Sequence, residues 1–172
     1  MIEIRNIEEL EEERERQFKA WIEAGKEEDE FYISLDWADL RLANLTGANL
    51  SGANLDYASL ELADLIGANL DGADLEGAIL IEADLTGADL RGADLTRAKL
   101  LLANLCGANL TRAKLLWADF RWANLCGADL TRAKLSVAKI SDTIITQSKY
   151  DELADVYSQK FMSGFIVKEL EE

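Results

Sequence analysis

The chain has 172 residues, which is enough for one domain with a sizeable core and short for two. Its 33 acidic and 18 basic residues give a formal net charge of −15, which argues against general binding to the phosphate backbone of nucleic acids. It has no histidine and only two cysteines, which excludes histidine-based acid–base chemistry, histidine metal sites and the usual catalytic triads.

The chain shows no sequence signal for export or for a membrane. The first 30 residues are rich in glutamate and lack the apolar stretch of a signal peptide. No apolar run approaches the roughly 20 residues that a membrane span needs. We therefore expect a cytoplasmic protein with no membrane partner and with reduced thiols.

Residues 6–24 are expected to form an amphipathic helix. Asn6 can cap its start, with Glu9 at the third helical position, and Gly25 can end it. We expect residues 1–32 to form a helical cap over the repeat that follows, although a helix that binds a partner is the alternative. One face of this helix is apolar and carries Leu10, Phe18, Trp21 and Ile22.

A five-residue repeat follows the helix. Alanine occupies every fifth position from Ala38 to Ala138, 21 times in succession, and leucine stands two residues later except at Phe120 and Ile140. This period fits neither the 3.6 residues of a helical turn nor the alternation of a strand. A chain that turns a corner every five residues satisfies it, with alanine and leucine pointing inward and the other three positions facing water.

A second period gives the number of corners in each coil. Residues 103–115 read ANLCGANLTRAKL and residues 123–135 read ANLCGADLTRAKL. The step of 20 residues indicates four pentapeptides per coil, with residue i stacked on residue i+20. Neighbouring coils should lie roughly 4.8 Å apart, so that the column is about 25 Å long.

The repeat resembles that of the pentapeptide-repeat family over about residues 33–142. This resemblance implies an all-β solenoid, a right-handed quadrilateral β-helix with four pentapeptides per coil and about five coils. The abundance of the repeat in cyanobacterial proteomes hints at an origin and not at a task. Some members look like DNA and bind type II topoisomerases, gyrase above all, but the fold itself does not assign a function.

Residues 143–172 are expected to form a C-terminal helix or tail. Ser148, followed three residues later by Asp151, can begin a helix, and Gly164 can end it before the apolar residues 165–167. The helix either caps the last coil or pairs with a second copy, because some relatives dimerise in this way. The apolar residues of this helix are Leu153, Val156, Tyr157 and Phe161.

Outward apolar side chains are the first candidate binding site. Contiguous exposed apolar patches tend to be contact sites, although a terminal helix or self-association can also cover such a patch. We expect a partner site centred on Ile81, Leu101, Leu102 and Trp122. Leu42, Leu62, Leu102 and Trp122 form one column interrupted by Glu82, with Ile79, Ile81 and Leu101 beside it and Leu116 and Trp117 one corner earlier.

Charge is distributed unevenly along the repeat. Residues 37–90 contain ten acidic residues and one basic residue, whereas residues 91–140 contain three acidic and nine basic residues. The acidic half approaches the charge density of duplex DNA, roughly one charge per 1.7 Å. The basic half interrupts such a surface, which argues against mimicry of DNA along the whole column. Stacked cations there could bind an acidic partner or could simply be solvated, and they are Arg112, Lys114, Arg132 and Lys134.

Other stacked polar pairs are expected to be structural. Asp64 over Asp84 and Asp74 over Asp94 form paired carboxylates on a convex surface without a cleft, which is unsuited to catalysis or calcium binding. Cys106 and Cys126 should stack as reduced thiols, and zinc would need two further ligands. We therefore expect no catalytic residue, no metal and no cofactor.

The sequence thus predicts a non-enzymatic scaffold that binds a partner protein through side-chain columns on a rigid β-helix. The alternative is a DNA-mimicking inhibitor or protector of gyrase or another type II topoisomerase. Direct binding of nucleic acid is not expected, and a homodimer through the C-terminal helix is left open.

Overall fold

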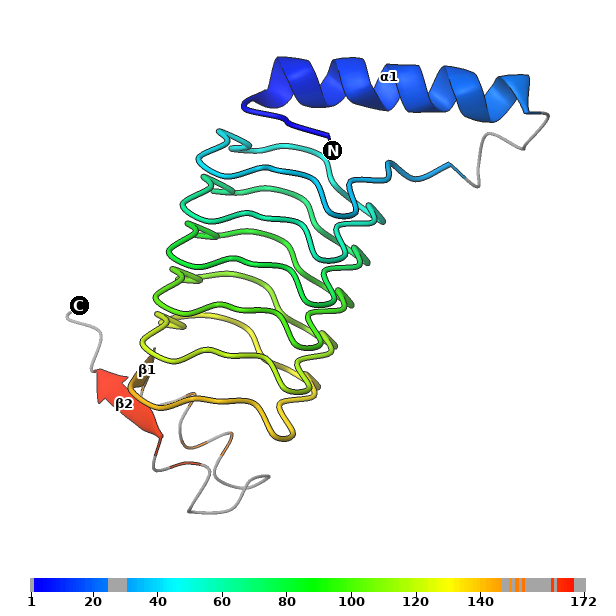
Figure 1. Cartoon of the computed structure of the whole chain (residues 1–172). Coiled ribbons are helices and arrows are strands. Elements are labelled where there is room, and N and C mark those ends of the chain that lie inside the picture. The colour runs from blue at the N-terminus through cyan, green and yellow to red at the C-terminus, as the bar shows by residue number, and fades with distance from the viewer. Residues whose placement is uncertain are drawn as a thin grey trace.

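The described part of the chain contains a stack of coils and the elements α1 (Ile7–Glu23), β1 (Thr143–Thr146) and β2 (Phe165–Lys168). Figure 1 shows α1 lying across one end of the stack, with β1 and β2 at the other end. The computed structural model describes residues 2–24, 31–146, 149, 151, 153, 162 and 164–168.

Neighbouring coils are joined by single-residue parallel β-bridges that recur every 20 residues. Asn44 is bridged to Asp64, and Asp64 is bridged in turn to Asp84. Each step uses two backbone hydrogen bonds, such as Leu45 N to Asp64 O at 2.7 Å and Asp64 N to Ala43 O at 2.9 Å. The stacking therefore follows the 20-residue step that the sequence indicates.

The interior is filled by the alanine and the leucine of each pentapeptide. Leu85 and Ala88 are fully buried, as are nearly all their equivalents, and Phe120 is buried completely in place of a leucine. Each buried leucine contributes about 2 kcal/mol through removal of its surface from water. Because alanine and leucine fill the interior, three positions are available for function: the residue before each leucine and the two turn residues after it.

Each corner is a tight turn that the residue before the leucine helps to close. The amide of Ala48 donates to the carbonyl of Leu45 at 3.0 Å, and the amide of Thr46 donates to Asn44 Oδ1 at 3.2 Å. The second bond explains why asparagine and aspartate dominate the position before leucine. The second turn residue has a positive φ, between 63° and 69° at nine glycines and between 55° and 63° at thirteen other residues.

The N-terminal residues extend the ladder beyond the first coil. Glu3 is bridged to Asp39 and Asn6 to Asn44, a pairing that the sequence analysis does not anticipate. Asn6 Oδ1 then accepts a hydrogen bond from Glu9 N at 3.0 Å, which is the capping arrangement that the sequence suggests. The helix spans Ile7–Glu23 where residues 6–24 were expected, and Gly25 lies outside the described residues.

Helix α1 contacts the start of the coils through its apolar side and one amide. Leu10 is 1% exposed, and the rings of Phe18 and Trp21 lie 5.3 and 5.9 Å from that of Phe31. The Gln17 amide donates to the carbonyl of Ser34 and accepts from its amide, both at 2.7 Å. The side chain of Ile22, the fourth predicted apolar residue, is not described.

The far end of the stack contains a strand pair that the sequence analysis misses. Strand β1 pairs in parallel with β2, with Thr143 opposite Phe165. The buried Thr143 hydroxyl donates to the carbonyl of Phe120 at 2.7 Å, which joins β1 to the coil below. The expected C-terminal helix falls mainly on residues outside the described part, including Ser148, Val156, Tyr157 and Phe161.

Candidate functional site

The second turn residues form four columns, one at each corner of the coil. Their side chains project from the solenoid at the step of the β-bridges, which is about 4.8 Å. We name the columns by their content: an aromatic corner (Trp37, Tyr57, Gly77, Arg97, Trp117, Val137), an apolar corner (Leu42, Leu62, Glu82, Leu102, Trp122, Asp142), a glycine corner (Gly47, Gly67, Gly87, Gly107, Gly127) and an arginine corner (Gly52, Gly72, Gly92, Arg112, Arg132).

The apolar and glycine corners differ although their backbones have the same conformation. The glycine corner carries glycine in every coil, whereas the apolar corner carries none. A non-glycine residue at positive φ costs about 1 kcal/mol or more. Leu102 and Trp122 are nevertheless 50% and 55% exposed, so that burial recovers only part of this cost.

The structure brings the predicted apolar residues together around this corner. Leu102 and Trp122 are exposed, while Ile79, Ile81 and Leu101 are half-buried beside them. Trp117 is also exposed but belongs to the aromatic corner, one corner earlier. A groove of about 540 Å³ continues the patch toward the N-terminal end and is lined by Arg5, Arg41, Leu42, Glu61, Leu62, Ile81 and Glu82.

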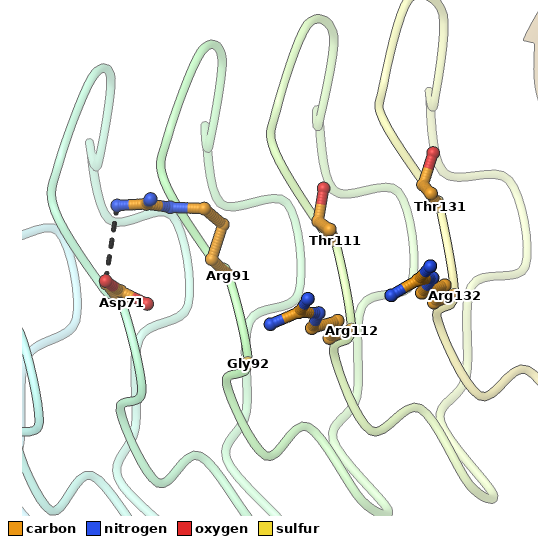
Figure 2. A pocket seen from close by; sticks show the side chains of 7 residues that line it. All are labelled: Asp71, Arg91, Gly92, Thr111, Arg112, Thr131 and Arg132. Atoms are coloured by element: carbon orange, nitrogen blue, oxygen red, sulfur yellow. Dashed lines mark hydrogen bonds and ion pairs between the residues drawn. The ribbon is translucent and has the colours of Figure 1, made fainter.

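The arginine corner carries a second groove, of about 560 Å³. Figure 2 shows the Arg112 and Arg132 side chains extending in the same direction along the corner, that of Arg112 toward the coil of Gly92. Arg91 is engaged by Asp71 at 3.2 Å and by Asp89 at 2.7 Å. The groove is lined by Asp71, Arg91, Gly92, Thr111, Arg112, Thr131 and Arg132.

Two predicted lysines lie beside the arginine corner, on the side that follows it. Lys114 and Lys134 are bridged to each other, as expected, and both are exposed. Lys114 Nζ lies 2.9 Å from an oxygen of Asp94, and this contact raises the pKa of the lysine. Burial raises the pKa of Asp94, but the hydrogen bonds from Lys114 and Thr96 outweigh it, so that the pKa is lowered.

Sequence reasoning misses one interacting group of carboxylates. Burial, together with the hydrogen bond and the charge of Asp74, raises the pKa of the Asp56 carboxyl to about 6. The neighbouring Glu76 adds further repulsion, although its amide donates to Asp56 Oδ1 at 3.1 Å. Asp56 is a first turn residue, and Asp74 is the residue before leucine in the next coil. The two are 18 residues apart, so that a comparison of residues 20 apart does not pair them.

The remaining predicted pairs are stacked as expected but are not gathered into one site. Asp64 is bridged to Asp84 on one side and Asp74 to Asp94 on another. Cys106 and Cys126 form no disulfide, and Cys126 is buried. Among the residues that the structure describes, no three His, Cys, Asp or Glu side chains are grouped so that they could hold a metal ion. No helix within the described ranges is long and apolar enough to cross a membrane.

The coils and corner columns define a β-solenoid repeat protein whose outward side chains are held in fixed rows. The sequence model described as "Pentapeptide repeats (8 copies)" matches residues 33–70, 58–97, 88–125 and 120–147. The chain therefore belongs to the pentapeptide-repeat family. A comparison with curated proteins found no match.

Solved structures of other pentapeptide repeat proteins are similar to this chain. HetL, involved in heterocyst differentiation regulation in the cyanobacterium Nostoc sp. strain PCC 7120, is 37% identical, with 65% of each chain covered and a TM-score of 0.34. Rfr23 from the cyanobacterium Cyanothece 51142 is 35% identical, with 64% of this chain and 59% of that chain covered and a TM-score of 0.30. The chain thus matches less than two thirds of the length of either relative.

A protein of plasmid-mediated fluoroquinolone resistance, QnrB1, is also similar in one trypsin-treated form. It is 21% identical, with 80% of this chain and 78% of that chain covered and a TM-score of 0.42.

Proposed function

We propose that the chain is a non-enzymatic scaffold that binds a partner protein through its apolar corner and through Ile79, Ile81 and Leu101 beside it. One observation carries the proposal, namely the contrast between the apolar and glycine corners of the same coils. The glycine corner shows that a turn of the same backbone conformation accommodates glycine at its second position. Leucine or tryptophan at positive φ is therefore not needed by the turn, and a contact outside the chain accounts for it.

The fold suits this function because it holds the contact side chains in place before a partner arrives. The amide of each apolar-corner residue from Leu42 to Trp122 is hydrogen-bonded to the next coil, as Leu62 N is to Ile81 O at 3.0 Å. Binding then costs little ordering of the backbone, so that more of the contact energy appears as affinity. Trp122 is the expected anchor, because tryptophan is enriched among the residues that dominate binding energy.

The test compares capture of partners by the wild-type chain and by the double variant Leu102→Lys/Trp122→Lys, using a lysate of the source organism and mass spectrometry. The matched control is Gly107→Lys/Gly127→Lys, which adds the same charges in the same two coils, one corner away. At both control positions an added Cβ meets no atom closer than 3.7 Å. Circular dichroism verifies the fold of all three proteins.

A partner held by the wild-type chain and the control, but lost from the apolar double variant, supports the proposal. Direct titration of the recovered partner should then show at least a tenfold weaker affinity for that variant, about 1.4 kcal/mol. Equal capture by all three proteins overturns it.

A second candidate, a DNA-mimicking inhibitor or protector of gyrase, is favoured by the acidic half alone. Residues 37–90 hold ten acidic residues and one basic residue, but residues 91–140 reverse the sign. A gyrase supercoiling assay tests it with the wild type and the triple variant Asp64→Asn/Asp74→Asn/Asp84→Asn. Inhibition or protection by the wild type that weakens in the triple variant supports this second candidate, and no effect of the wild type rejects it.

A further inference from the structure

One side of the solenoid carries its charge in two blocks. This side runs from the arginine corner to the aromatic corner. We leave aside Asp71 and Arg91, the first turn residues of the arginine corner, which pair with each other at 3.2 Å. The side then comprises the second turn residues of the arginine corner, the residues before leucine that follow them, and both turn residues of the aromatic corner. Five acids precede five bases along it without exception, and we call it the bipolar face. In chain order its charged residues are Asp36, Asp56, Asp74, Glu76, Asp94, Arg97, Arg112, Lys114, Arg132 and Lys134.

The next side of the same coils shows that this order is not a property of the repeat. There the charges are mixed, and neighbours within one pentapeptide neutralise each other, as in Arg41 with Asp39 and Arg121 with Asp119, each at 2.7 Å. The sign changes repeatedly along that side through Asp39, Arg41, Glu61, Glu82, Lys99, Asp119, Arg121, Lys139 and Asp142.

Ion pairs within the bipolar face lie near its middle, and the charged residues toward its two ends have no ion-pair partner. Arg97 is 3.3 Å from Glu76 and Lys114 is 2.9 Å from Asp94. Among the described residues, three acids toward the N-terminal end and three bases toward the C-terminal end form no ion pair. These are Asp36, Asp56 and Asp74 in the N-terminal coils, and Arg112, Arg132 and Lys134 in the C-terminal coils.

The shape of the arginine corner complements this charge order. Its middle coils carry Gly72 and Gly92, where an added Cβ would meet no atom within 4 Å, whereas Gly52 before them is covered by the ring of Tyr32. Its C-terminal coils carry the long side chains of Arg112 and Arg132. The groove in Figure 2 lies where the corner changes from glycine to arginine. Long cationic side chains in the C-terminal coils thus face the same way as the open backbone at Gly72 and Gly92 and as carboxylates that form no ion pair.

We propose that two copies of this chain associate side by side and antiparallel through the bipolar face, about a two-fold axis near Asp94. Such an axis places the acidic coils of each copy on the basic coils of the other and repeats every contact twice. Asp74 then lies level with the coil of the partner copy that carries Arg112 and Lys114. The guanidinium of Arg112 reaches the open backbone at Gly72, next to Asp71.

The antiparallel arrangement also separates the most acidic elements of the two copies. Helix α1 carries seven acidic and three basic residues and lies at the N-terminal end of the stack. Parallel association would bring the two helices together and place like charges opposite each other along the whole face. Antiparallel association places the helices at opposite ends, which lowers the repulsion between copies that are each charged −15.

Association of this kind is salt-dependent and modest in affinity. The column is only about 25 Å long, so that the contact is smaller than the roughly 800 Å² per partner of a standard interface. Its attraction comes from exposed charges, which are screened beyond about 3–4 Å at 0.5–1 M salt and act over more than 20 Å near 0.02 M salt. We expect the dissociation constant to rise at least about tenfold between these conditions.

Sedimentation velocity of the full chain over a range of concentrations tests the proposal. The first variant, Arg112→Glu/Arg132→Glu, changes the net charge of the face from zero to −4, and the second, Asp56→Lys/Asp74→Lys, changes it to +4. Each alone should remain monomeric, whereas an equimolar mixture should form a heterodimer. The control, Lys99→Glu/Lys139→Glu, reverses two cations on the next side and should dimerise as the wild type does.

A wild-type chain that stays monomeric in low salt overturns the proposal. So does a mixture of the two reversed variants that remains monomeric while both are folded by circular dichroism. A dimer that neither salt nor either reversal weakens also overturns it and assigns the contact to another surface. The apolar variant Leu102→Lys/Trp122→Lys should leave the dimer intact, so that this test fails or succeeds independently of partner binding.

Discussion

Glycine at position 77 is required by an aromatic ring as well as by the turn. Its φ is 66°, and a Cβ built there would lie 2.4 Å from Cε1 of Tyr57, whose ring lies over the glycine. Tyr57 in turn stacks on Trp37, with ring centroids 4.7 Å apart and an angle of 14° between the planes. Gly77→Ala must therefore strain the turn and also displace Tyr57 from its stack.

The variant Gly87→Ala strains the turn but displaces no ring, so that it isolates the first of these two costs. Gly87 has a φ of 65°, and an added Cβ there meets nothing within 4 Å. Alanine at positive φ costs about 1 kcal/mol. Loss of an aromatic stack adds about 1 kcal/mol. We therefore expect Gly87→Ala to lower the free energy of unfolding by about 1 kcal/mol and Gly77→Ala by about 2 kcal/mol.

Urea unfolding followed by far-ultraviolet circular dichroism measures both variants, and the Tyr57→Ala background completes the comparison. In that background Gly77→Ala should cost no more than Gly87→Ala, because the ring that it displaces is absent. Equal losses for the two glycine variants in the wild-type background would refute the role assigned to Tyr57. An unchanged excess at Gly77 without Tyr57 would refute it as well.

Three further predictions concern the core and the carboxylates. The pKa of Asp56, raised from 3.8 to about 6, means that stability falls as pH rises through this interval. Asp56→Asn should therefore be more stable than the wild type at pH 7, by no more than about 1 kcal/mol after solvent screening, and should match it near pH 4 in urea titrations. Phe120→Ala leaves a cavity at a fully buried position and should cost about 3–5 kcal/mol in the same assay, whereas Phe120→Leu restores the usual residue and should cost about 1 kcal/mol. Thr143→Val removes the buried bond to the Phe120 carbonyl and should cost about 1–2 kcal/mol by thermal unfolding.

The sequence predicts the solenoid because its core and its corners repeat in phase. The alanine and leucine positions specify what is buried, and the 20-residue step specifies which residue of the next coil lies above. The expected neighbours, such as Lys114 with Lys134, follow from this step alone. The same phase also shows which side chains point outward, and it therefore yields the columns of candidate contact residues.

Contacts between residues that are not 20 positions apart, or that lie outside the repeat, cannot be predicted by the same reasoning. The Asp56–Asp74 contact is spaced by 18 residues and the Arg97–Glu76 ion pair by 21, because turn residues lean toward neighbouring positions of the adjacent coil. The pairing of residues 2–6 and of β2 with the ends of the stack involves segments outside the repeat, which carry no period. Positive φ at the apolar and aromatic corners can be inferred from the sequence only when those positions are aligned with the glycines of other corners.

The separation of core and surface makes the two proposed contacts independent of each other and of folding. A second turn residue such as Leu102 or Arg112 is attached to a backbone that the ladder fixes on both sides, while the alanine and leucine of the same pentapeptide remain buried. Substitutions at the apolar corner and on the bipolar face share no described side-chain partner, so that their effects on stability should add within about 0.5 kcal/mol. If the apolar double variant also abolished dimerisation, the two surfaces would have to be treated as one interface.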